Sequence, residues 1–333
     1  MIDFSILICV YNPDIRLLSK CIDAVKALDT TNISFEVILV DNNSNPGLET
    51  YPIVQDARKT IPNLVTLIEP KQGISHARVA GIKAAKGKYI IIFDGDNDPH
   101  ADYLQVLSKL TKQHSSVGAW GPGNVWVDFI DGVEDMLRPK AMELFQERHD
   151  NFTIFACLRS WEDCYPFGTG LCIKIEHALS YINLFERGHF TLKGREGNRL
   201  SSGEDTQMVL SCIVNGEAAG RSPDLKINHV IPANRANLNY MKRLRYGLNI
   251  DYDLTIKQVI PEYKVNFGRP LKKSLWHSIK IYRKLIKAVI TNNSEKVIDL
   301  ISHCSIRAGA YQAMERPIPT TLKRVLKMVK ASY

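Results

Sequence analysis

The stretch KGKYIIIFDGDNDPHADYL, residues 86–104, joins a short apolar run to a group of carboxylates. The run from Tyr89 to Phe93 is rich in isoleucine, which is typical of a buried β-strand. Asp94 and Asp96 follow where this strand ends. On an extended chain, residues i and i+2 project from the same face, so these two side chains would bring negative charge into one small space.

Two interpretations explain these acids. Crowded carboxylates are costly unless a cation neutralises them, and hard oxygen ligands suit Mg²⁺ or Mn²⁺. Alternatively, Asp94, Asp96 and Asp98 form an acidic turn after a strand, because Asp, Asn and Gly are common turn residues. The stretch alone leaves both interpretations open.

The first hundred residues alternate between apolar strand patterns and helical patterns. Strands are predicted at residues 4–11, 35–41, 63–69 and 88–94, and helical segments at 13–28, 46–60 and 73–87. Continuous apolar strands that alternate with helices indicate a mostly parallel sheet with helices on both faces. The fold class is therefore α/β, with a nucleotide-binding type of sheet.

Polar clusters follow the first, second and fourth of these strands, with the sequences NPD, DNNSN and DGDND. Ligands of such sheets bind outside the carboxyl ends of the strands, so we expect the three clusters to share one crevice. No G-x-G-x-x-G and no G-x-x-x-x-G-K-[ST] is present. A dinucleotide-binding Rossmann site and a P-loop are therefore not expected.

Three further segments matter for the middle of the chain. Residues 117–130 are predicted to form a strand and a turn, and residues 167–175 a strand preceded by glycines. Residues 204–217 predict a helix that opens with two acids, which favour the positive end of a helix, and closes at Asn215-Gly216.

The composition is that of a folded protein. The 333 residues are 45% hydrophobic and 23% charged, and no apolar run approaches the ~20 residues of a membrane span. A strand pattern begins almost at the N-terminus, so we expect no signal peptide. The seven cysteines are scattered without a C-x-x-C pair, which predicts reduced, mostly buried thiols in a cytoplasmic setting and no zinc site.

Charge is distributed unevenly along the chain. From Lys226 onward there are 21 basic and 6 acidic residues, a net charge of +15, whereas the preceding residues carry −7. This predicts an anionic partner, either a membrane or a nucleic acid. No nucleic-acid-binding motif is recognisable, so we expect no nucleic acid. Residues 239–250, 271–290 and 320–333 are basic and amphipathic, which suits helices on an anionic membrane surface or helices that pack their apolar stripe internally.

Four motifs together resemble a known family. VYNP, LVDNNS, GISHARVAGIKAAKGKYIIIFDGD and SGEDTQMVL occur in the order and spacing of the family 2 glycosyltransferases of GT-A fold. The resemblance covers roughly residues 3–235. It implies an inverting transferase that moves a sugar from a nucleotide-diphosphate donor to an acceptor hydroxyl. It also suggests a nucleotide-sugar half at 1–115 and an acceptor half at 116–237, and the basic helical region at 238–333 lies outside the resemblance.

The resemblance assigns donor contacts to five residues. Tyr11 and Asn12 belong to the first motif, and Asp41 is where the family reads the base, most readily the uracil of a UDP-sugar. Arg78 lies where the family places a basic contact to the nucleotide, although a solvated helix face explains an arginine equally well. Gly95 leaves room for a closely approaching phosphate, at a position where many relatives carry an acid.

A metal site is implied at the same place. The resemblance makes Asp96 a ligand of Mn²⁺ or Mg²⁺, places Asp94 at the ribose or in the metal shell, and suggests His229 as a third ligand. The ion would neutralise the departing diphosphate. The alternative for His229 is a packed or surface histidine on a strand.

The same resemblance assigns the catalytic base to the pair Glu204-Asp205, and within it to Asp205. Glu204 would then cap backbone N–H groups, and the alternative for the whole motif is simply a favourable helix N-terminus. Trp120, Trp126 and Trp161 either stack against sugar rings or belong to the core. His76, His100, His177 and His189 receive no role.

The predicted acceptor is a glycan or a lipid-linked saccharide of polysaccharide or O-antigen synthesis. The basic region would attach the protein peripherally to the inner face of the plasma membrane. Two alternatives remain: a sugar nucleotidyltransferase, which would carry a glycine-rich phosphate loop after the first strand, and a catalytically inactive sugar-nucleotide-binding scaffold.

Overall fold

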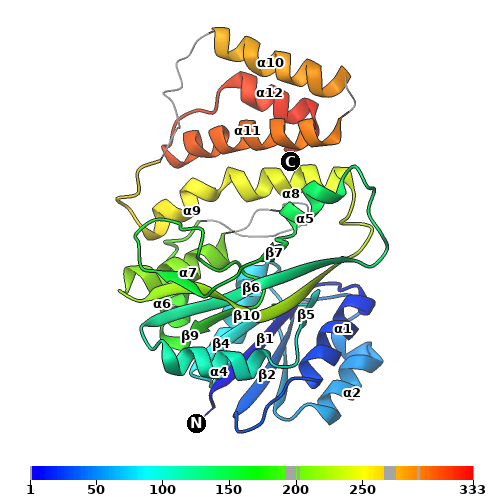
Figure 1. The fold of residues 1–333 in the computed structure, drawn as a ribbon, viewed down its shortest axis with the longest axis vertical. Helices are drawn as coiled ribbons and strands as arrows, with labels where there is room; N and C mark the ends of the chain where they lie inside the picture. The colour runs from blue at the N-terminus through cyan, green and yellow to red at the C-terminus, as the bar shows by residue number, and fades with distance from the viewer. Residues whose placement is uncertain (1, 192–199, 201–202, 266–274, 291–292, 333) are drawn as a thin grey trace. The chain divides into compact units, whose positions relative to one another are not determined.

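The computed structural model describes residues 2–191, 200, 203–265, 275–290 and 293–332. The chain forms two compact units. The first comprises residues 1–128, 147–193 and 204–230, and the second comprises residues 129–146, 194–203 and 231–333. Figure 1 shows the strands in the first unit and the C-terminal helices in the second.

A single mixed sheet forms the centre of the first unit. Its main strands lie in the order β3 (Leu64–Ile68), β2 (Phe35–Asp41), β1 (Phe4–Val10), β4 (Tyr89–Asp94), β9 (Leu171–Lys174), β6 (Val117–Phe129), β10 (Ala218–Ile231) and β5 (Asn97–Pro99). Two short strands pair with its longest members, β7 (Arg148–His149) with β6 and β8 (Ile154–Ala156) with β10. The α/β class and the four predicted N-terminal strands are confirmed.

The first four strands of the sheet form a parallel block. β3, β2, β1 and β4 run parallel to one another, whereas β9 pairs antiparallel with both β4 and β6, and β5 pairs antiparallel with β10. Every residue of β1 is buried. Because helices cover both faces of this part of the sheet, both side-chain sets of a strand are apolar and the strand reads as a continuous hydrophobic run.

Two groups of helices cover the two faces (Figure 1). α1 (Ile15–Lys26), α2 (Pro52–Thr60) and α4 (Tyr103–Gln113) pack on the face that carries Ile6 and Ile8 of β1. α3 (Ile74–Ala84), α6 (Ile175–Glu186) and α7 (Glu204–Val214) pack on the other face. Gly81 lies directly against the side chain of Leu7, so α3 approaches β1 closely because this position lacks a Cβ. A short 3₁₀ turn, η1 (Leu48–Thr50), precedes α2.

The strand and turn predicted for residues 117–130 are confirmed, and the turn begins at Ile130. β6 runs unbroken from Val117 to Phe129, through Gly121, Pro122 and Gly123. A Cβ on Gly123 would lie 2.7 Å from the backbone carbon of Ser222, and one on Gly121 would lie 2.5 Å from the Cβ of Pro166. These glycines therefore allow close approach of neighbouring segments and do not reverse the chain.

The predicted end of the helix at residues 204–217 is confirmed. α7 ends at Val214, and Gly216 has a φ of +85°. The N–H of Gly216 donates to the carbonyl of Ile213, and the N–H of Glu217 donates to that of Cys212. This is a glycine-terminated helix end in which the left-handed residue satisfies the last carbonyls.

The second unit is helical over its C-terminal part. Its helices are α5 (Arg138–Leu144), α8 (Leu238–Ile250), α9 (Tyr252–Val259), α10 (Leu275–Ile290), α11 (Ser294–Ala313) and α12 (Thr320–Met328). The predicted basic helices correspond to α8, α10 and α12, while residues 271–274 and 333 lie outside the described residues. No helix in the described part of the chain is long and apolar enough to span a membrane.

The apolar stripes of α10 and α12 pack inside the second unit. Ile281 and Leu285 of α10 and Val325 of α12 are buried in one cluster with Ile301 of α11. The interpretation that these helices pack their apolar stripe internally is therefore correct for these side chains.

The seven cysteines are free thiols, as predicted, and all except Cys157 are buried. Burial is the main reason that the pKa of Cys9 is raised to about 12. The cysteines contribute to packing and form no disulfide.

Candidate active site

The loops that follow β1 and β2 are joined by hydrogen bonds. Asn12 adopts the left-handed region with a φ of +42°. Its backbone N–H donates to Oγ of Ser44 at 2.9 Å, and its side-chain Oδ1 accepts from the N–H of Asn45 at 2.8 Å. Tyr11, the residue before Asn12, is exposed. The two predicted donor residues therefore lie at the carboxyl ends of the parallel strands, as expected.

Asp41 organises the loop that it begins. It is buried, its Oδ1 accepts from the N–H of Ser44 at 2.8 Å, and its Oδ2 accepts from the N–H of Leu48 at 3.0 Å. Short-range bonds of this kind are typical of Asp at the start of a loop. Contact with a nucleotide base stays a prediction for this residue, since its carboxylate already has this structural role.

Asn42 joins a third loop to the loop after β2. The sequence pattern did not indicate this role of Asn42. Its Nδ2 donates to the carbonyls of Glu69 and Lys71, and its Oδ1 accepts from the N–H of Gly73 at 2.8 Å. Gly73 is the residue before α3, so Asn42 fixes the start of the helix that carries Arg78.

The buried Asn97 holds the turn after β4 through hydrogen bonds to Asp94 and Asp96. Oδ1 of Asn97 accepts from the N–H of Asp94 at 3.1 Å, and its Nδ2 donates to Oδ1 of Asp96 at 3.0 Å. Gly95 is required for packing, because a Cβ there would lie 2.7 Å from Cγ1 of Val10. Sequence reasoning missed Asn97, although its position within DGDND was the available signal.

Arg78 bridges two carboxylates that are far apart in the sequence. Its Nη1 lies 2.9 Å from Oε1 of Glu204 and its Nη2 lies 3.3 Å from Oδ1 of Asp94. The arginine side chain is only 5% exposed, so the interpretation of Arg78 as a solvated helix residue is wrong. Glu204, predicted to cap a helix, is likewise buried and paired with this arginine.

The charges around Arg78 are strongly coupled. Burial by itself lowers the pKa of Arg78, but the negative charges of Glu204, Asp94 and Asp205 outweigh it and raise the pKa above its ordinary value. The guanidinium is therefore held in its charged form, and Asp205 belongs to the same electrostatic cluster.

Asp205 is seated against the loop that precedes β9. Its Oδ2 accepts from the N–H of Gly168 at 2.9 Å, and its Oδ1 accepts from the N–H of Thr206 at 2.8 Å. A Cβ on Gly168 would lie 2.7 Å from Oδ2 of Asp205, so glycine is required for this contact. The two N–H groups fix the orientation of the carboxylate.

The register between β5 and β10 brings His229 close to Asp96. His229 pairs with Asn97 across the two strands, and the N–H of Val230 donates to the carbonyl of Asp96. Nε2 of His229 lies 3.6 Å from Oδ2 of Asp96, and both side chains are largely buried. Asp98 is engaged differently, because its Oδ2 accepts from Nδ2 of Asn228 at 3.0 Å.

The donor set at this turn fits a divalent ion. Ligand atoms of Mg²⁺ lie about 2.0–2.1 Å from the metal, so an oxygen and a nitrogen 3.6 Å apart can approach one ion from two sides. Carboxylate and imidazole are also suitable ligands for Mn²⁺. Asp94 lies two residues away, with Oδ1 directed to Arg78. Asp94, Asp96 and His229 do not all lie within 4.8 Å of one another, in contrast to a second cluster in the described part of the chain.

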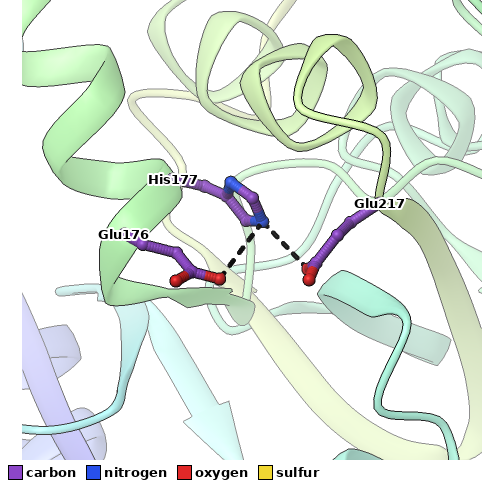
Figure 2. Close-up of side chains that lie close together, drawn as sticks. All are labelled: Glu176, His177 and Glu217. Atoms are coloured by element: carbon purple, nitrogen blue, oxygen red, sulfur yellow. Dashed lines mark hydrogen bonds and ion pairs between the residues drawn. The ribbon is translucent and has the colours of Figure 1, made fainter.

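That second cluster consists of Glu176, His177 and Glu217 (Figure 2). Nε2 of His177 lies 2.9 Å from Glu217 and 3.9 Å from Glu176. Lys174 also pairs with Glu217, at 2.6 Å. Lys174 pairs with Tyr89 at the start of β4, whereas Asp94 ends that strand. The cluster therefore lies at the opposite end of the strands from Asp94. Lys174 already supplies the positive charge, so we interpret the cluster as an ion-pair network.

We predict that Glu217→Gln destabilises the protein. Burial alone raises the pKa of Glu217, but the bonds and charges of Lys174 and His177 outweigh it and lower the pKa below its ordinary value. Hydrogen bonds to charged groups contribute about 1.5–3 kcal/mol, so we expect a loss of this order in the free energy of unfolding at pH 7, measured by urea denaturation.

The difference in the free energy of unfolding between wild type and Glu217→Gln depends on pH in a defined direction. A lowered folded-state pKa contributes stability above the unfolded pKa of glutamate, about 4.3, and this stability is lost as the pH falls through the folded-state pKa. Wild type and Glu217→Gln should therefore converge in acid. Glu176→Gln is the control, since Glu176 is exposed and 3.9 Å from the histidine. Equal stability of the two variants at pH 7 would contradict the role of Glu217.

The protein has the α/β class, and Arg78 joins acidic side chains at the carboxyl ends of the parallel strands, which is where ligands of such sheets bind. Residues 5–165 of the chain match the family model "Glycosyl transferase family 2".

Curated relatives carry the same kind of description. "Glycosyltransferase AglE" of Haloferax volcanii is 31% identical over 150 residues, which are 45% of this chain and 44% of that protein. "Uncharacterized glycosyltransferase EpsJ" of Bacillus subtilis is 33% identical over 110 residues, which are 33% of this chain and 30% of that protein. The chain thus spans less than half the length of these relatives. Among solved structures, S. aureus TarS 1–349 covers 99% of this chain and 90% of its own, with 15% identity and a TM-score of 0.48.

Proposed function

We propose that this protein is a metal-dependent, inverting glycosyltransferase that moves a sugar from a nucleotide-diphosphate donor, a UDP-sugar, to a hydroxyl group. The acceptor is a glycan or a lipid-linked saccharide in polysaccharide or O-antigen synthesis. The observation that carries the proposal is the bridge from Asp94 through the buried Arg78 to the buried Glu204.

This bridge supports a donor site and a catalytic base in one place. Asp94 ends β4, and Glu204 begins α7, which also carries Asp205. Arg78 and Glu204 form a buried ion pair, and removing one partner from such a pair typically costs about 3–5 kcal/mol. Asp94, which is partly exposed, adds a weaker contact to the same arginine. In the proposed reaction, Asp94 and Asp96 belong to the donor side and Asp205 to the acceptor side.

On the donor side, Asp96 and His229 would hold Mn²⁺ or Mg²⁺, with Asp94 beside them. When bound, the ion supplies Lewis-acid assistance to the departing diphosphate. Asn97 orients Asp96 through the bond to its Oδ1. The joined loops that carry Tyr11, Asn12 and Asp41 would hold the nucleoside.

On the acceptor side, Asp205 would accept the proton of the attacking hydroxyl. A base must be fixed within hydrogen-bond reach of that proton. The N–H groups of Gly168 and Thr206 hold the carboxylate in place, and each carboxylate oxygen retains a further acceptor position. Glu204 would act as a positioning residue through Arg78.

The basic helical region would attach the protein to the cytoplasmic, inner face of the plasma membrane. α10 buries Ile281 and Leu285, yet it exposes Ile279 and Ile286, which are seven residues apart and lie on one helix face. The neighbouring exposed residues of α10 are Lys280, Arg283, Lys284 and Lys287. Exposed isoleucines among cations suit an anionic lipid surface. Lys272 and Lys273 belong to the basic amphipathic segment predicted at residues 271–290, and they lie outside the described residues.

The nucleotidyltransferase alternative has less support. The turn after β1 contains Tyr11, Asn12 and Pro13 and no glycine, and the N–H of Asn12 already donates to Ser44. A backbone cradle for a phosphate requires free N–H groups. The scaffold alternative is distinguished by the experiments below.

We predict that UDP-sugars raise the melting temperature of the protein in the presence of Mn²⁺, and that Asp96→Ala abolishes the Mn²⁺-dependent part. A panel of UDP-, GDP- and dTDP-sugars, each with and without Mn²⁺, also identifies the base. Asp98→Asn is the control, because Asp98 is bonded to Asn228. A donor-induced shift in Asp96→Ala that equals the wild-type shift would refute the metal role of Asp96.

We predict that Asp205→Asn retains donor binding but loses transfer. The amide keeps an acceptor oxygen for Gly168, but it cannot take a proton, and general bases contribute about 10²–10⁴-fold to the rate. The measurement is release of UDP in the presence of acceptor, alongside the donor-induced thermal shift. Turnover near the wild-type rate, in a variant with an unchanged thermal shift, would place the base elsewhere.

We predict that replacing both Ile279 and Ile286 by serine weakens binding to phosphatidylglycerol vesicles at least tenfold, since burying one isoleucine contributes about 1.5–3 kcal/mol. Co-sedimentation measures the binding. Ile306→Ser is the matched control, because Ile306 is a similarly exposed isoleucine on α11. Equal sedimentation of the double variant, or equal binding of wild type to uncharged phosphatidylcholine vesicles, would contradict this mode of attachment.

A further inference from the structure

An aromatic cluster lies just before the loop that contacts Asp205. The rings of Trp161 and Phe167 stack, with centroids 6.3 Å apart and an interplanar angle of 27°. Tyr165 meets Trp161 edge-on, at 5.7 Å and 89°. Trp161 and Phe167 are partly exposed, whereas Tyr165 is fully buried. Two of the three rings therefore retain accessible surface.

The cluster is held rigidly by polar contacts. The hydroxyl of Tyr165 donates to the carbonyl of Leu158 at 2.8 Å and accepts from the N–H of the same residue at 2.7 Å. The guanidinium of Arg148 lies over the Phe167 ring, 4.9 Å from its centroid. Contacts of this kind fix aromatic rings before any ligand arrives, so little conformational entropy is lost on binding.

The same segment contains the group that orients the proposed base. Phe167 directly precedes Gly168, whose N–H donates to Oδ2 of Asp205 at 2.9 Å. Pro166 packs closely on Gly121 of β6, where a Cβ would lie 2.5 Å from it. The aromatic rings and the contact to Asp205 are therefore on one fixed stretch of chain.

The other tryptophan side chains that the structure describes have different surroundings. Trp120 is fully buried in the core. Trp126 is exposed, but its ring stacks on His100, with centroids 5.4 Å apart at 13°, and its centroid lies 5.3 Å from that of His149. Of the two tryptophans with accessible surface in the described part of the first unit, Trp161 is the one beside the loop that binds Asp205.

We infer that Trp161, supported by Phe167, is the surface on which a sugar ring of the acceptor packs. The inference rests on the proposed function and names the acceptor subsite of that function. The C–H faces of a pyranose are apolar, and the face of an aromatic ring carries negative partial charge that attracts them. A ring stacked here would lie on the segment that holds Asp205, and the sugar would need no charged group.

Direct binding tests the inference without turnover. The probes are methyl glycosides of glucose, galactose and N-acetylglucosamine, titrated in the presence of UDP and Mn²⁺, and saturation-transfer difference NMR of the glycoside reports the binding. We expect a saturable change in wild type that is lost in Trp161→Leu, which keeps apolar bulk but no ring. The change should persist in Trp161→Phe and in the control Trp126→Ala, since neither loses the ring at position 161.

Steady-state kinetics with the natural acceptor give the second readout. We expect Trp161→Leu to raise the acceptor KM about tenfold, which corresponds to the loss of one stacking interaction, and to leave the donor KM unchanged. The donor-induced thermal shift shows that each variant is folded.

Two results would overturn the subsite: a saccharide response in Trp161→Leu equal to that of wild type, or a rise in the donor KM with no change for the acceptor. A wild type that responds to none of the three glycosides would also count against it. Failure of the proposed function is recognised separately, because wild type would then show no thermal shift with any nucleotide sugar.

Discussion

A buried guanidinium holds the candidate site together. The guanidinium of Arg78 contacts Asp94 through Nη2 and Glu204 through Nη1, and the side chain is almost excluded from water. Desolvating a cation is unfavourable, and the paired carboxylates offset that cost only while both remain in place. The end of β4 and the start of α7 therefore cannot separate without leaving an unpaired buried charge. The positions of Asp96 on the adjacent turn and of Asp205 on the helix depend on this constraint.

Around the bridge, amides and carboxylates that follow the strands bind backbone groups of the loops. Asn12 and Asn42 join three separate loops, whereas Asp41 and Asn97 hold their own loops in place. Backbone N–H groups at strand ends need partners, and short polar side chains provide them. The loops at the carboxyl ends of the strands are thus ordered before a ligand arrives, so less conformational entropy is lost when it binds. Gly168 and Gly95 serve the same end by allowing contacts that a Cβ would block.

Several features were predictable because they follow from local pattern. The strands β1, β2 and β4 were visible as continuous apolar runs, and the helix at residues 204–217 as an acidic start with a glycine end. Gly121 and Gly123 have a role in packing that the local pattern does not reveal. Glycine and proline signal a turn when no other demand is made of them, but here the neighbouring backbone of Ser222 approaches too closely for any side chain. A single sequence does not distinguish the two uses of glycine.

By itself, the sequence determined the α/β class, the carboxylates after β4 and the acid pair at the start of α7, because hydrophobic periodicity and helix signals depend on residues only a few positions apart. Tertiary structure alone decided which of these acids act together. Arg78 and Glu204 are 126 residues apart, and His229 reaches Asp96 only through the register of β5 and β10. The same register directs Asp98 away to Asn228. Pairings of this kind depend on how strands and helices pack, and no local pattern specifies them.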